Sequence, residues 1–139
     1  MTAQQNDDLE TKQIPENELE DYFTKFTKHF LLRDTTSRVD LEVISTDLGD
    51  QFAANDVRIL GITYEPKDKA LEFELEAGDH RVFTPSQVWV TEEADGFIRS
   101  IEVVRGDGTR SIAKVKRGAV VPASRAQSSS ADANRENRT

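Results

Sequence analysis

The chain has 139 residues, no cysteine and a formal net charge of −8, with 36% hydrophobic and 32% charged residues. This length and composition predict one domain, and the absence of cysteine excludes disulfides, thiolate metal sites and cysteine nucleophiles. The acidic balance disfavours nonspecific binding to nucleic acid or to an anionic membrane, because the phosphate interaction would be repulsive overall.

The two ends of the chain differ from its centre. Residues 1–13 are polar without periodicity, and residues 119–139 contain no large apolar residue after Val121. Both segments are expected to be disordered tails around a single domain at 14–118, because they bury too little surface to offset their ordering entropy. No secretory signal and no apolar run near the ~20 residues of a membrane span occurs, so we expect a cytoplasmic protein without membrane contact.

The first predicted element is an amphipathic helix within residues 14–32, IPENELEDYFTKFTKHFLL. A proline suits its first turn, and the acidic residues that follow favour the positive end of the helix dipole. One apolar stripe recurs at helical spacing and consists of Leu19, Tyr22, Phe23, Phe26 and Phe30. We expect Phe23 and Phe26 to be buried against the strands that follow.

From residue 38 the apolar period changes to two, which is typical of half-buried strands. Alternating segments occur at 38–45, 60–65, 71–75, 80–92, 97–104 and 109–116. Pro85 predicts that the fourth segment is one strand bent or interrupted at that point. The Asp107-Gly108 pair is the clearest hairpin signal.

One helix followed by five to six short antiparallel strands is an α+β arrangement. We predict that the strands form a strongly curved sheet or a small barrel of the Sm or SH3-like kind, with the N-terminal helix packed on it. Fold alone does not assign a function.

Several stretches resemble an uncharacterised bacterial family, known as a domain of unknown function. They are STDLGDQ at 45–51, LGITYEPKDKALEFELE at 60–76, the Asp79-His80 pair, the segment Val88 to Val90, and IEVVRGDGTR at 101–110. The motif of the type LGITYxPKDxxLE is the most specific of these. The resemblance implies a compact, soluble bacterial protein and carries over no activity, ligand or catalytic residue.

Glu72, Glu74 and Glu76 form a row of carboxylates on one predicted strand. Side chains two apart on a strand lie about 7 Å from each other, which is too far to chelate one ion at ~2–2.6 Å without another strand. We therefore interpret the row as the solvent-facing side of the sheet, with an acidic docking surface and a metal site as alternatives. The two histidines make no recognisable metal spacing and no phosphate-binding loop occurs, so we expect no metal and no cofactor.

His80 is the candidate for an acid–base role, because the carboxylate of Asp79 stands next to it in the sequence. Neighbouring residues of a strand point to opposite faces, so a structural role is favoured. No serine lies in a nucleophile elbow. We expect a protein that is not an enzyme, and a small hydrolase or isomerase using His80 and carboxylates stays an alternative.

A basic run surrounds the last predicted hairpin and comprises Arg105, Arg110, Lys114, Lys116 and Arg117. Small barrels can bind RNA through loops and aromatic stacking, so an RNA-binding β-barrel is the first alternative, although the net charge argues against a nucleic-acid partner. The leading hypothesis is a small non-enzymatic binding or regulatory module that acts through protein contacts or self-association. Small sheets have edge strands that invite such pairing.

Overall fold

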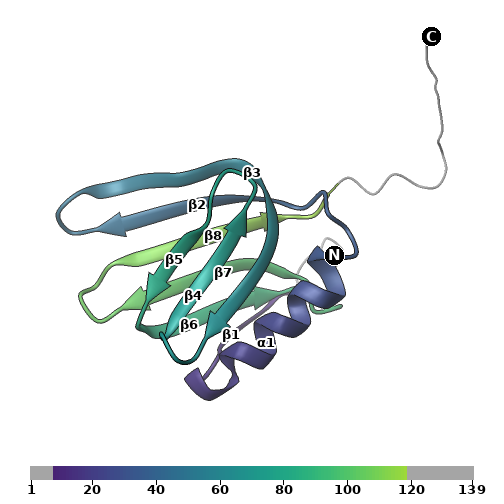
Figure 1. The fold of residues 1–139 in the computed structure, drawn as a ribbon, viewed down its shortest axis with the longest axis horizontal. Coiled ribbons are helices and arrows are strands. Elements are labelled where there is room, and N and C mark those ends of the chain that lie inside the picture. Colours follow the sequence, from purple (N-terminus) through teal and green to yellow (C-terminus); the bar gives the residue numbers. More distant parts are fainter. Residues whose placement is uncertain (1–7, 119–139) are drawn as a thin grey trace, which may run out of the picture.

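The computed structural model describes residues 8–118, which form an eight-stranded antiparallel sheet and one α-helix, α1 (Figure 1). The strands follow the spatial order β1-β6-β7-β8-β2-β3-β4-β5. Their bounds are β1 (Glu10–Gln13), β2 (Arg38–Ser45), β3 (Gly49–Glu65), β4 (Ala70–Leu75), β5 (His80–Phe83), β6 (Pro85–Glu92), β7 (Ile98–Arg105) and β8 (Arg110–Lys116).

The predicted amphipathic helix is confirmed. A short 3-10 turn, η2 (Glu16–Glu18), leads into α1 (Leu19–Phe26), and the helix continues as a π-helical segment, η3 (Thr27–Leu31). Phe23 and Phe26 are almost completely buried, in one cluster with apolar residues of the strands such as Leu41, Leu71 and Phe73. The expected packing of the apolar stripe on the sheet is therefore confirmed.

The long strand β3 joins the two halves of the sheet. Its residues 49–58 pair with β2, and its residues 59–65 pair with β4. Register shifts interrupt both pairings, and Asp56 has a positive φ of 56°. Such bulges bend a strand, which lets β3 leave one half of the sheet and enter the other.

The helix occupies the space between these halves. The hydroxyl of Thr27 donates to the carbonyl of Ile62 and accepts from its amide, both at 3.0 Å. The helix therefore supplies hydrogen-bond partners to backbone groups on the edge of β3 that no longer pairs with β2. On its other side Phe26 packs against Phe97, with ring centroids 5.6 Å apart. The core therefore lies between the helix and the inner faces of both halves.

The predicted α+β fold of five to six strands in a strongly curved sheet or small barrel is wrong. The structure is mostly antiparallel sheet, its eight strands have an open order that ends at β1 and β5, and β1 precedes the helix. Two strand segments gave no periodic signal. β1 is short and polar, and residues 49–58 of β3 are exposed on both faces except at Ala54 and near the end.

The segment 80–92 contains two strands instead of one bent strand. β5 pairs with β4, whereas β6 pairs with β1 and β7. Thr84 alone separates them and has a positive φ of 53°, which is uncommon for a β-branched residue. The sheet tolerates Pro85, which has no amide hydrogen to donate, because it is the first residue of β6.

The predicted N-terminal tail is shorter than expected, because residues 10–13 form β1 and pair with β6. Residues 1–7 and the predicted C-terminal tail at 119–139 lie outside the described residues. Between residues 8 and 118, no helix combines the length and the apolar character that a membrane span requires.

Candidate functional site

The three carboxylates of the predicted acidic row have separate partners. Glu72 lies 3.4 Å from the Nε of Arg81 on β5, and Glu74 accepts a hydrogen bond of 3.1 Å from the Thr63 hydroxyl on β3. Glu76 follows the end of β4 and is exposed. Among residues 8–118, no group of three potential ligands could hold a metal ion. Glu72 and Glu74 are thus partly buried in ordinary cross-strand pairs, and Glu76 alone of the three is exposed.

His80 is half-buried on β5 and its ring lies against that of Phe73, with centroids 6.4 Å apart. Burial lowers the pKa of His80, because the charged imidazolium is disfavoured away from water. The carboxylate of Asp79 accepts a hydrogen bond from the Leu75 amide at 3.3 Å. This geometry gives no support to the alternative of acid–base catalysis, which stays a prediction.

Two members of the predicted basic run lie at the tip of the β7–β8 hairpin. Arg105 donates to the carbonyl of Phe83 at 3.1 Å and stands 3.8 Å from Asp107. Arg110 forms an ion pair of 2.9 Å with Glu102 on the neighbouring strand. Both guanidinium groups therefore link strands and turns.

The other members face different sides. Lys114 and Lys116 lie on the outer face of β8, where Lys114 pairs in register with Asp40 and Lys116 lies 3.1 Å from Asp56. Arg117 turns toward the helix instead. Arg110, Lys114 and Lys116 therefore share the outer face of β8, where Arg110 and Lys116 are paired with carboxylates. The barrel on which the RNA-binding alternative depended is not formed by residues 8–118.

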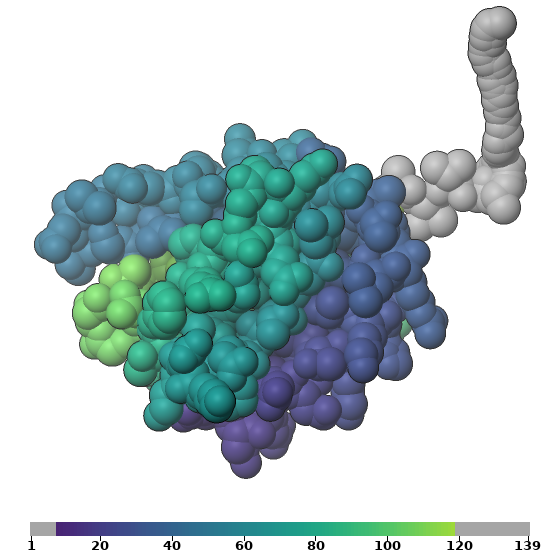
Figure 2. Space-filling view, in the orientation of Figure 1, coloured from purple at the N-terminus to yellow at the C-terminus, as the bar shows by residue number. Residues whose placement is uncertain are grey.

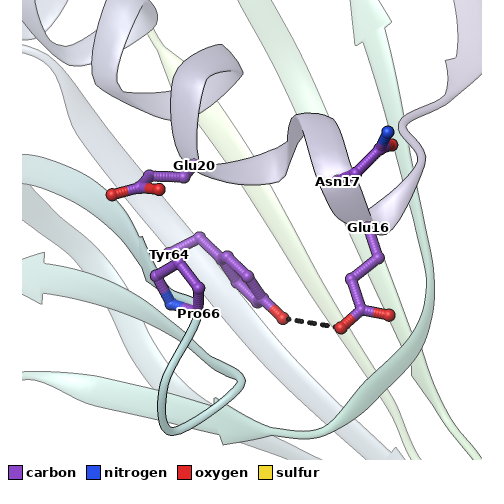
Figure 3. A pocket seen from close by; sticks show the side chains of 5 residues that line it. All are labelled: Glu16, Asn17, Glu20, Tyr64 and Pro66. Carbon is purple, nitrogen blue, oxygen red and sulfur yellow. Dashed lines mark hydrogen bonds between the residues drawn. The ribbon is translucent and has the colours of Figure 1, made fainter.

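A cleft of about 580 Å³ lies at the N-terminal end of the helix (Figure 3). It is lined by Glu16, Asn17, Glu20, Tyr64 and Pro66. The hydroxyl of Tyr64 donates to Glu16 at 3.4 Å, and burial together with this carboxylate raises the pKa of Tyr64. Figure 3 shows the carboxylate of Glu20 pointing away from this pair, so the two acids do not converge on one point.

A second hollow, of about 310 Å³, lies between the helix and the turn that connects β6 and β7. We call it the aromatic groove, and it is lined by Tyr22, Lys25, Phe26, His29, Phe30, Asp95 and Gly96. The helical spacing of residues 22, 26 and 29–30 places these side chains on one flank of the helix. Phe26 and Phe30 pack with centroids 5.4 Å apart, and Phe30 also packs on Phe97 at 5.5 Å.

The polar groups inside the aromatic groove are already satisfied by the protein. Tyr22 donates to Glu92, and its burial and this carboxylate raise the pKa of the phenol. Arg117 lies 2.5 Å from Asp95 and over the ring of Phe97, and its hydrogen bond holds the pKa of Asp95 below the usual range. The walls are therefore apolar, and the one carboxylate of the lining is neutralised.

The exposed rim of the aromatic groove carries basic side chains. Lys25 and His29 stand on it, and the exposed Lys28 lies on the same end of the helix. Lys25 is 3.0 Å from Asp21, but an exposed ion pair of this kind contributes little and its lysine can reorient. An apolar hollow with a few polar groups at its edge is the usual form of a small binding site.

Sequence reasoning missed this groove. It assigned Tyr22 and Phe30 to the buried stripe, whereas the structure leaves both partly exposed at the margin of the core. The sequence held no signal for it, because five aromatic or apolar residues over twelve positions form an ordinary amphipathic stripe. The turn at 93–97 that forms the opposite wall could not be placed without the tertiary structure.

Comparison with other proteins places the chain in a family. Residues 10–124 match the sequence profile described as "Family of unknown function (DUF5335)". A protein of Aquifex aeolicus (strain VF5) with the name "Uncharacterized protein" is 36% identical over 115 residues, which cover 82% of this chain and 99% of that protein. No solved structure matches the chain. The expected resemblance is confirmed, and the chain belongs to the DUF5335 family of unknown function.

Proposed function

We propose that this protein is a small protein-binding module and that the aromatic groove is its binding site. The partner is a segment that presents one large apolar side chain between acidic residues. The observation that carries this proposal is the combination of aromatic walls with the basic rim of Lys25 and His29, in a chain whose net charge is −8. Basic side chains at the rim of an apolar hollow favour an acidic ligand at this position.

The volume of the groove fits such an anchor. About 310 Å³ is at the lower end of the range of ligand pockets, which is about 300–1,000 Å³. Tyr22, Phe26 and Phe30 offer ring faces and edges to an incoming apolar group, and aromatic residues often carry most of the binding energy of such contacts. The cleft near Tyr64 is larger than the aromatic groove. However, the Tyr64 hydroxyl and the Glu16 carboxylate that line it already bind each other, so they are less available to a ligand.

The test is a titration of the ¹⁵N-labelled protein with a short capped peptide that carries one phenylalanine between two pairs of aspartates. We expect the shift changes to include α1, η3 and residues 93–97. The variant Lys25→Glu/His29→Glu should weaken binding by about tenfold or more. Phe83→Ala is the matched control, because Phe83 is an exposed aromatic residue on β5, away from the groove.

Two results would contradict the proposal. The first is equal affinity for a peptide in which lysines replace the aspartates, because the rim would then have no role. The second is a set of shift changes that leaves α1, η3 and residues 93–97 unaffected, or no change at all.

A further inference from the structure

The hairpin of β2 and β3 ends in a projecting segment, residues 45–52, which we call the arm. Figure 2 shows the hairpin as a blue projection beside the green tip of the β7–β8 hairpin. The arm carries Leu48 and Phe52, which are 69% and 64% exposed, more than any other large apolar side chain in residues 8–118. One exposed apolar residue is ordinary, but two on one projecting tip mark a contact surface.

The arm is held in a defined shape. The amide of Leu48 donates to the hydroxyl of Ser45 at 3.0 Å, and Gly49 takes the positive φ of 68° that the turn requires. At the base of the arm, Ile44 pairs in register with Arg110 of β8. A tip that is ordered before binding loses less conformational entropy when it docks.

The chemistry of the arm complements that of the aromatic groove. Asp47 and Asp50 are exposed on either side of Leu48, so the apolar tip has acidic flanks. The groove has apolar walls and the basic rim of Lys25 and His29. The arm thus presents an apolar group between acidic residues, and the groove presents an apolar hollow beside basic residues. Electrostatic complementarity favours the pairing of these two surfaces.

The arm cannot fill the groove of its own chain, because the two lie on opposite sides of the molecule (Figure 1). We infer that the arm of a second copy occupies the groove. This inference rests on the proposed function and names the partner. If each chain of a pair inserts its arm into the other, the contact is closed by a twofold axis, which is the commonest symmetry of homo-oligomers.

The first experiment measures the mass of the full-length protein by sedimentation velocity between about 5 and about 500 µM, because a dimer depends on protomer concentration. We expect the wild type to become dimeric in this range. An arm variant, Leu48→Ser/Phe52→Ser, and a groove variant, Lys25→Glu/His29→Glu, should each stay monomeric. All four positions are exposed, so circular dichroism should show an unchanged fold.

Two further tests separate this contact from any other. An equimolar mixture of the arm variant and the groove variant should form a heterodimer, because one intact arm then meets one intact groove. A chain with both Asp47→Lys/Asp50→Lys and Lys25→Glu/His29→Glu should dimerise again, because the charges of both sides are exchanged together. Phe83→Ser is the control, and it should dimerise like the wild type.

The outcomes distinguish this inference from the proposed function. A wild type that stays monomeric at every concentration, yet binds the aspartate-flanked peptide, would overturn the second copy as partner and leave the proposed function standing. A dimer that persists in both variants would place the contact on another surface and overturn the inference. A monomer that also fails to bind the peptide would overturn both.

Discussion

His80 shows how a residue that looks like a site in the sequence can have a structural role. The strand β5 turns its ring toward Phe73, where it is half-buried, and burial lowers its pKa. Arg117, from the predicted basic run, also has a structural role, because it binds Asp95 and covers Phe97 beside the helix. At this scale the surroundings of each ionisable group decide its role, and these surroundings come from distant parts of the chain.

We predict a histidine-dependent loss of stability in mild acid. Because the pKa of His80 is lowered in the folded chain, the unfolded chain binds a proton first as the pH falls through about 6.5. The free energy of unfolding therefore decreases from about pH 7.5 to about pH 5.5. The variant His80→Gln should show a smaller decrease in urea titrations over this range.

The control for this prediction is His29→Gln, measured at a protein concentration low enough to keep the chain monomeric, because His29 is exposed on the helix. It should follow the wild-type profile. Parallel curves for the wild type and His80→Gln would show that the burial of His80 has no energetic consequence.

At the scale of elements, the contact between the helix and β3 replaces a missing strand. The amide and carbonyl of Ile62 would lack a partner where β2 has left β3, and the hydroxyl of Thr27 binds both. Buried backbone groups need such partners, because their desolvation is costly. The helix is therefore tied to the sheet by its polar side as well as by its apolar stripe.

We predict that Thr27→Val destabilises the protein by about 1–3 kcal/mol, because it keeps the shape of the side chain but leaves two backbone groups of Ile62 unsatisfied. Chemical denaturation with far-ultraviolet circular dichroism measures this change. Thr24→Val lies one turn earlier on α1 and should cost less than about 0.5 kcal/mol. Equal effects of the two variants would contradict the role of the Thr27 hydroxyl.

At the scale of the whole molecule, β3 makes the two halves of the sheet interdependent. Its first part belongs to the β2 side and its second part to the β4 side, and the helix contacts both halves through Ile62 of β3 and Glu92 of β6. One continuous core cluster includes residues of the helix and of every strand except β1. Neither half can unfold without removing a strand from the other.

We therefore predict one cooperative unfolding transition. The fluorescence of Trp89 on β6 and the circular dichroism of the whole chain should give coincident urea curves. Two separated midpoints would show that the β4–β5 side unfolds independently. Because the inferred dimer would add stability that depends on concentration, the measurement is made at low protein concentration and repeated at high concentration.

The sequence by itself determined the local features. The absence of cysteine excluded disulfides, the apolar stripe predicted the helix and the burial of Phe23 and Phe26, and the alternating segments predicted most strands. The motifs predicted a family of unknown function, which the comparisons confirmed. These features are local because each depends on periods of two or 3.6 residues within one segment.

Only the tertiary structure decided what depends on distant neighbours. Residues 49–58 are mostly exposed and show no apolar alternation, so their strand exists because β2 pairs with them, and β1 exists because β6 pairs with it. The aromatic groove likewise needs the turn at 93–97 beside the helix. Only the folded structure shows that the arm projects on the side of the molecule opposite that groove. Strand pairing and groove formation are long-range contacts, and no periodicity within a segment encodes them.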